Sequence, residues 1–144
     1  MIRDSEKRPH ERLDVWQDAM MLVEAVYRLT AVFPDSERFG LVAQMRRAAI
    51  SIPSDIAEGA ARRSTAEYLR FLSIARGSLA ELDTQLQIST RLGLATPSAE
   101  IEENLHRTFA RLNALLLALE KRPLEARSSQ SPITNPQSRP SHAR

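Results

Sequence analysis

The chain has 144 residues, of which 42% are hydrophobic and 26% charged, with a formal net charge of +2. This length fits a single domain with tails. The chain has no cysteine, which excludes a disulfide framework and a thiolate metal site and is typical of a cytoplasmic protein. No apolar run reaches the roughly 18 residues of a membrane-spanning helix, and the N-terminal segment lacks the apolar core of a signal peptide. We therefore expect a cytoplasmic protein without membrane contact.

The positive charge comes almost wholly from arginine, which supplies 18 of the 20 basic side chains. Arginine favours bidentate contact with carboxylate or phosphate groups. High genomic GC content explains much of the same bias, so composition alone does not identify a binding surface.

The first predicted helix runs from about Arg12 to Val32, after a polar segment, residues 1–11, that we expect to be a flexible arm. Its apolar residues alternate steps of three and four, which is the seam spacing of a bundle helix. They are Leu13, Trp16, Met20, Val23, Tyr27 and Thr30. We predict that the single tryptophan packs in the core rather than serving as a ligand platform.

The second predicted helix follows a turn at Pro34, with Asp35 or Ser36 as its cap. Its apolar face is formed by Leu41, Met45, Ala48, Ile52 and Ile56. Pro53 lies within this pattern and removes one backbone hydrogen bond, but the apolar phase continues across it. We therefore predict one helix, kinked at Pro53, that ends in the run from Gly59 to Arg63.

The third predicted helix begins at a capping box, with Ser64 as N-cap and Glu67 as its return partner, and ends at Gly93. Its apolar face is Tyr68, Leu72, Ala75, Leu79, Leu82, Leu86 and Ser89. The fourth predicted helix has Thr96 as N-cap and Pro97 as its first residue. Its apolar face is Ile101, Leu105, Thr108 or Phe109, Leu112, Leu115, Leu116 and Leu119.

Four such helices with short connections predict an all-α fold, an up-down-up-down four-helix bundle over residues 12–122. The proline-rich segment 123–144 has no apolar period, and we predict a disordered tail there. The helices carry more small and apolar surface than one bundle core uses, so we expect a homo-oligomer.

A polar stripe runs beside the apolar face of the second helix at the same helical spacing. One interpretation is a solvated face, with Glu58 and Arg62 as an ordinary i,i+4 pair. The other is a hydrogen-bonded structural seam between helices or subunits, completed by residues of the third helix. The candidate seam residues are Arg47, Ser51, Glu58, Arg76 and Glu81. The pattern leaves both interpretations open.

Three stretches resemble the four-helix-bundle proteins encoded by intervening sequences in bacterial 23S ribosomal RNA genes. They are LDVWQDAMMLVEAVYRLT, FPDSERFGLVAQMRRAAISIPSDIAEGAARRS and EYLRFLSIARGSLAELDTQLQISTRLG. The accessory variability determinant of diversity-generating retroelements belongs to the same broad family. The resemblance, over roughly residues 12–121, implies a bundle that assembles into a ring, typically a homopentamer. It also implies association with nucleic acid, no enzymatic activity and, in a retroelement, a reverse transcriptase as partner.

The first functional hypothesis is the binding of RNA or DNA by one end of the bundle. In an up-down bundle, the start of the first helix, the corner between the second and third, and the end of the fourth share one pole. The candidate nucleic-acid-binding residues at this pole are Arg12, Arg62, Arg63, Arg70, Lys121 and Arg122. We expect such binding to be salt-sensitive and weakly sequence-specific. The alternative is a protein-binding scaffold ring with no direct nucleic-acid contact.

Signals for catalysis are weak. Glu103 and His106 match one copy of the Glu-x-x-His motif of di-iron bundle sites, but the sequence has no second copy. No histidine is placed to activate a serine, and the chain has no P-loop and no glycine-rich fingerprint. We therefore predict that the protein is not an enzyme and has no catalytic residue, metal site or cofactor.

Overall fold

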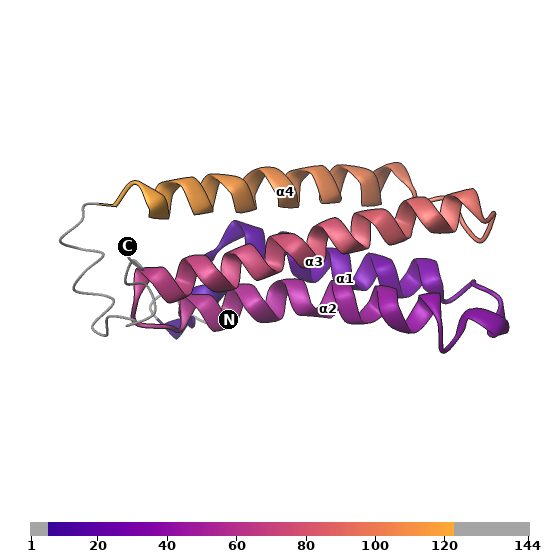
Figure 1. Ribbon diagram of the computed structural model, residues 1–144, viewed down its shortest axis with the longest axis horizontal. Coiled ribbons are helices and arrows are strands. Elements are labelled where there is room, and N and C mark those ends of the chain that lie inside the picture. The colour runs from indigo at the N-terminus through magenta and orange to yellow at the C-terminus, as the bar shows by residue number, and fades with distance from the viewer. Residues whose placement is uncertain (1–5, 123–144) are drawn as a thin grey trace, which may run out of the picture.

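The computed structural model describes residues 6–122, which form four α-helices packed along a common long axis (Figure 1). The helices are α1 (Asp14–Thr30), α2 (Leu41–Ala60), α3 (Thr65–Arg91) and α4 (Ala99–Glu120), with short 3-10 helices η2 (Pro9–Arg12) and η3 (Asp35–Glu37). The described residues contain no strand, so the prediction of an all-α fold is confirmed. None of these helices is long and apolar enough to cross a membrane.

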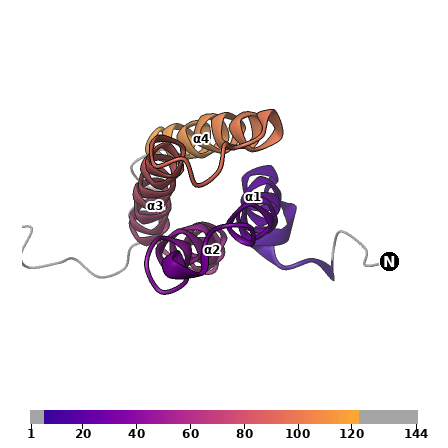
Figure 2. The ribbon, with the colours of Figure 1, turned by 90° about the vertical axis from the view of Figure 1, so that its right-hand side faces the viewer.

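The helices enclose one core, and each helix packs beside its neighbours around it (Figure 2). The predicted apolar faces of α2, α3 and α4 are the faces that the structure buries. Their fully buried members include Met45, Ile52, Ile56, Leu72, Leu79, Leu82 and Leu112. Each of these three helices has one dominant apolar stripe, and burying that stripe is the main source of stability for a bundle helix.

The core-facing side of α1 differs from the prediction. The buried residues are Val15, Ala19, Leu22 and Val26. In the predicted stripe, Met20 and Tyr27 are instead 39% and 38% exposed, and Trp16 is half-buried beside the core. Both stripes are apolar and both follow steps of three and four, so the helical period does not decide which one faces inward. The predicted stripe lies at the edge of the core, next to α2. Its Thr30 is buried, and Leu13, Trp16 and Val23 are partly buried against the core.

Two predicted helix caps are wrong. Because η3 forms a separate turn, α2 begins only at Leu41, so neither Asp35 nor Ser36 is its N-cap. At the start of α4, Ser98 Oγ accepts a hydrogen bond of 3.2 Å from the Ile101 amide. Ser98 is therefore the N-cap in place of Thr96. In both cases another residue of the connection satisfies the helix terminus.

The sharp corner between α2 and α3 forms largely as predicted. Ser64 Oγ accepts a hydrogen bond of 3.0 Å from the Glu67 amide, which caps α3 as predicted. The predicted return bond from the Glu67 carboxylate is not formed, and Glu67 Oε1 lies 3.8 Å from Arg62 Nε. Gly93, with a φ of 73°, follows α3 in the left-handed conformation that glycine adopts without strain. α2 runs through Pro53 as one helix. The kink at Pro53 stays a prediction.

Part of the expected N-terminal arm is ordered against the bundle. Pro9–Arg12 forms η2, which packs beside α1 and α2. The His10 and Trp16 rings meet edge to face, with centroids 5.0 Å apart. The predicted tail, residues 123–144, and the first part of the arm, residues 1–5, lie outside the described residues.

Candidate functional site

The six candidate nucleic-acid-binding residues lie at one end of the bundle, which we call the basic pole. They are Arg12, Arg62, Arg63, Arg70, Lys121 and Arg122. They come from the end of η2, the α2–α3 connection, the first turns of α3 and the end of α4, which meet at this end (Figure 1). Arg122 Nη1 donates a hydrogen bond of 3.2 Å to Thr65 Oγ1 and so ties the end of α4 to the start of α3. The fold therefore gathers cations that are distant in sequence.

A buried phenylalanine positions two of these arginines. Phe71 is 7% exposed, and the guanidinium carbons of Arg62 and Arg70 each lie 4.8 Å from its ring centroid. Cation–π contacts of this kind restrict the arginine side chains without neutralising their charge. The basic pole therefore presents oriented guanidinium groups, and such groups suit bidentate contacts with phosphate oxygens.

Acidic side chains partly neutralise Arg62. Its Nη2 lies 3.0 Å from Glu58 Oε2, and its Nε lies 3.8 Å from Glu67 Oε1, with all three side chains about half exposed. Exposed pairs of this kind contribute only about 0–1 kcal/mol, so an incoming phosphate can replace either carboxylate at small cost. Arg63 makes no hydrogen bond or ion pair with any residue between 6 and 122. Its charge is therefore available to an external anion.

Two ionisable groups next to the basic pole have shifted pKa values. Burial raises the pKa of the Tyr68 hydroxyl, and the nearby Arg122 guanidinium opposes that rise. Tyr68 therefore stays neutral and does not reduce the positive charge at the pole. Burial also raises the pKa of the Asp55 carboxyl, and the charge of Glu58 adds to the rise. Both effects favour protonation of Asp55, because burial disfavours a charged carboxylate and the negative charge of Glu58 repels it.

The five candidate seam residues do not bond to one another within the chain. Ser51 Oγ donates to the Ala48 carbonyl of its own helix at 2.8 Å, and Glu58 pairs with Arg62. Arg76 Nη1 donates at 3.0 Å to Asn113 Oδ1 on α4, on a different side of α3 from α2. The remaining candidates are Arg47 and Glu81, which are both exposed. A seam that joins copies of the chain stays a prediction.

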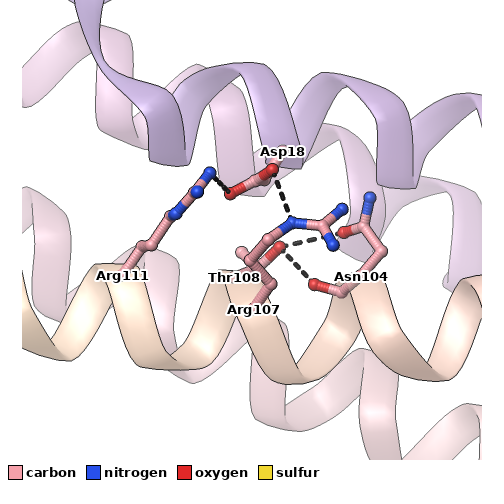
Figure 3. Close-up of polar contacts among 5 residues, drawn as sticks. All are labelled: Asp18, Asn104, Arg107, Thr108 and Arg111. Carbon is pink, nitrogen blue, oxygen red and sulfur yellow. Dashed lines mark hydrogen bonds and ion pairs between the residues drawn. The ribbon is translucent and has the colours of Figure 1, made fainter.

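A buried ionic cluster between α1 and α4 was missed by the sequence analysis (Figure 3). Asp18 is 4% exposed, and its Oδ1 and Oδ2 accept hydrogen bonds from Arg107 Nε at 3.0 Å and Arg111 Nη1 at 2.7 Å. Next to it, Thr108 Oγ1 donates to the Asn104 carbonyl at 2.7 Å. The two arginines are one helical turn apart and so reach the same carboxylate. The cluster fixes the pairing of α1 with α4 and is a structural element.

The one Glu-x-x-His match lies outside any cluster of metal-ligating side chains in the described part of the chain. Glu103 and His106 are both exposed on α4. Within residues 6–122, no group of three or more histidine, cysteine, aspartate or glutamate side chains is placed to hold a metal ion. The Glu-x-x-His match is therefore a surface pair in this structure.

The chain matches the model of a known protein family. The family model described as "23S rRNA-intervening sequence protein" matches residues 11–117, which include all of α1, α2 and α3 and most of α4. No curated protein sequence matches the chain. The matched region contains Arg12, Arg62, Arg63 and Arg70 of the basic pole, whereas Lys121 and Arg122 lie beyond it.

Proposed function

Because this chain belongs to the 23S rRNA-intervening sequence protein family, we propose that it is a non-enzymatic homo-oligomer that binds RNA or DNA through its basic pole. We propose a homopentamer, as the resemblance implies, and a cytoplasmic location, which the cysteine-free sequence favours. The observation that carries the proposal is the convergence of cations from four parts of the chain at one end of the bundle.

The chemistry of the basic pole favours phosphate as its ligand. Arg62 and Arg70 are oriented on Phe71, and Arg63 has no partner among the described residues. Phosphate contacts position a nucleic acid but carry little sequence information. Since Phe71 is buried, its ring is not free to stack on a base. We therefore infer salt-sensitive binding with weak sequence specificity.

Assembly would strengthen this binding. The net charge of one chain is only +2, which gives a weak field. Copies arranged with their basic poles on the same side add their local fields, and a concentrated positive field raises both affinity and association rate for a polyanion. The proposal therefore requires that monomers bind much more weakly than the assembly.

The proposed binding is tested by a salt titration of two matched double variants. Arg63→Gln/Arg70→Gln removes two charges from the basic pole, whereas Arg28→Gln/Arg91→Gln removes two exposed charges from the ends of α1 and α3 that lie at the opposite pole. If each lost arginine is one phosphate contact, the slope of log affinity against log salt should fall by about 1.4–1.8 per protomer in the first variant only. Equal slopes in the two variants would contradict a role for the basic pole.

The second candidate function is a scaffold ring that binds proteins and has no nucleic-acid contact. Exposed apolar side chains in the α1–α2 and α3–α4 connections favour this alternative, since exposed apolar surface marks protein association. Val32, Phe39 and Leu92 are 74%, 88% and 63% exposed. In a retroelement, the partner would be the reverse transcriptase. Undetectable affinity for RNA and DNA at low salt, with the oligomer intact, would exclude the first function and favour the scaffold.

A further inference from the structure

An open apolar groove lies on the outer side of α1 and α2. It is lined by Trp16, Met20 and Val23 of α1 and by Ile50, Pro53 and Ala57 of α2, and it encloses about 370 Å³. A second hollow of about 560 Å³ shares Ile50 and extends the groove toward Tyr27, Ala43 and Arg47. Ile50 is 43% exposed and Met20 is 39% exposed. We call the two hollows together the α1–α2 groove.

The spacing of the groove residues points to a helix as the occupant. Trp16, Met20, Val23 and Tyr27 follow steps of four, three and four, and Ile50, Pro53 and Ala57 follow steps of three and four. Residues along one face of a helix keep this period, so each of the two helices lines the groove with one continuous face. Such a surface can receive the ridge of another helix, because the contact recurs once per turn. The groove therefore has the pattern of a helix-in-groove site.

A matching ridge lies on the outer face of α3, on a different side of the bundle (Figure 2). Ile74, Gly77, Glu81, Thr84 and Ile88 follow steps of three and four along this exposed face, which we call the α3 stripe. Ile74 and Ile88 are each 41% exposed. A Cβ on Gly77 would meet nothing within 4 Å, so the stripe is open next to Ile74. The missing side chain at Gly77 allows a neighbouring helix to approach closely there.

The charges of the two surfaces are complementary. Arg47, which lines the groove, makes no hydrogen bond or ion pair within the described part of the chain. Glu81 on the α3 stripe accepts only a hydrogen bond of 3.2 Å from Gln85 of its own helix among residues 6–122. An exposed cation on one surface and an exposed carboxylate on the other set both the partner and the register of an interface.

The heights of these residues along the bundle also agree. Gly59 meets Phe71 near the basic pole, and Ser89 Oγ donates to Met45 Sδ at 3.9 Å toward the other end. Since α2 and α3 are antiparallel between these contacts, Ala57 lies at about the height of Ile74. By the same reasoning, Ile50 lies at about the height of Glu81, and Arg47 is one turn away. Two bundles placed side by side in the same orientation thus bring Ala57 opposite Ile74 and place Arg47 within one helical turn of Glu81.

We propose that a second copy of this chain inserts its α3 stripe into the α1–α2 groove, with the two bundles parallel. The interface joins two different surfaces, so an open chain of copies has one free groove at one end and one free stripe at the other until the assembly closes. Interfaces of this head-to-tail kind form rings when the rotation closes. All basic poles then lie on one side of the ring. The inference rests on the proposed homo-oligomer and adds the surfaces that form it.

The test uses one variant of each surface with a matched neighbour as control. Met20→Glu places a charge in the groove, and Met21→Glu places it on the adjacent residue, which is 50% exposed and does not line the groove. Ile74→Glu changes the α3 stripe, and Ser73→Glu changes its exposed neighbour. Molar mass is measured by light scattering at micromolar concentration, and circular dichroism melts establish that each variant is folded.

We expect Met20→Glu and Ile74→Glu to be monomers, while the two controls keep the wild-type mass. Mixed in equal amounts, the two monomeric variants should form a one-to-one dimer and nothing larger. Each such pair has one intact groove facing one intact stripe, and both remaining surfaces are damaged. A mixture that stays monomeric would overturn the pairing of these two surfaces, as would an Ile74→Glu variant of wild-type mass.

A charge exchange tests the register independently. Arg47→Glu and Glu81→Arg should each raise the dissociation constant of the assembly by roughly 3- to 10-fold, and both changes in one chain should restore it. A double variant weaker than either single variant would overturn the pairing. A wild-type chain that is monomeric would refute the homo-oligomer itself, whereas an oligomer unaffected by all these variants would refute only the assigned surfaces.

Discussion

Gly59 and Phe71 set how closely α2 and α3 approach at the basic pole. A Cβ added to Gly59 would lie 2.9 Å from the Phe71 Cβ and 3.1 Å from Tyr68 Cδ1. Neither neighbour is the mobile end of a long chain, since one is a Cβ and the other a ring atom of a half-buried tyrosine. The absence of a side chain at Gly59 therefore allows the crossing that places Phe71 beneath Arg62 and Arg70.

Gly59→Ala should destabilise the bundle by about 1–3 kcal/mol, because the added methyl forces two packed side chains to move. Gly77→Ala is the matched control, since a Cβ at Gly77 meets nothing within 4 Å. In the middle of α3 that change should stabilise the fold by roughly 0.5–1 kcal/mol. Denaturant titrations of both variants in the Met20→Glu background separate folding from assembly. Equal effects at the two glycines would show that the crossing tolerates a side chain.

The sequence predicts the packing of α2, α3 and α4 because each has one dominant apolar stripe. It does not predict which side of α1 faces inward, because this helix has two apolar stripes of equal period. One stripe runs from Val15 to Val26 and the other from Trp16 to Tyr27. Which of the two stripes faces inward depends on where α4 packs, and the residue pattern of α1 alone does not specify that position. The basic pole could be located from helix order alone, because antiparallel helices bring alternate connections to the same end.

The buried ionic cluster of Asp18, Arg107 and Arg111 could not be predicted from the sequence either. Asp18 is separated from Arg107 by 89 positions and from Arg111 by 93, so only the pairing of α1 with α4 brings them together. The one signal for this cluster in the sequence is an aspartate within a mainly apolar helix face. A carboxylate buried on such a face requires a partner. An inward-facing Asp18 also implies the observed orientation of α1, with Val15, Ala19, Leu22 and Val26 in the core.

Asp18→Ala should destabilise the fold by about 2–4 kcal/mol, because it removes two charge-assisted hydrogen bonds from a buried carboxylate. The arginine side chains are 39% and 44% exposed and can recover hydration, which keeps the loss below that of a fully buried pair. Asp14→Ala, an exposed position near the start of the same helix, is the control. A double-mutant cycle with Arg111→Ala measures the coupling, and a coupling near zero would contradict the ion pair.

Glu58→Ala should change the free energy of unfolding by no more than about 0.5 kcal/mol. The Glu58 side chain is 51% exposed and pairs with Arg62 one turn along, and exposed i,i+4 pairs contribute only a few tenths of a kcal/mol. Leu82→Ala provides the comparison, since truncating this fully buried leucine should cost about 2–5 kcal/mol. A loss near 2 kcal/mol for Glu58→Ala in the assembled protein, but not in a monomeric variant, would place Glu58 in a seam between copies.

Asp55→Asn should stabilise the protein at neutral pH. Burial first, and the charge of Glu58 second, raise the pKa of Asp55 above the unfolded value of 3.8, so the folded state favours the protonated carboxyl. The stability that protonation contributes is complete below the unfolded pKa and is lost as pH rises through the folded pKa. At pH 7 the charged carboxylate is therefore unfavourable, and an amide of the same shape avoids that penalty. Since Asp55 is only partly buried, the gain should stay below about 1 kcal/mol. Unfolding curves of both proteins should differ at pH 7 and converge about one unit below the unfolded pKa of 3.8, where Asp55 is largely protonated in the folded and unfolded states alike. A difference that persists at low pH would mean that hydrogen bonding of the amide, rather than removal of charge, produces the effect.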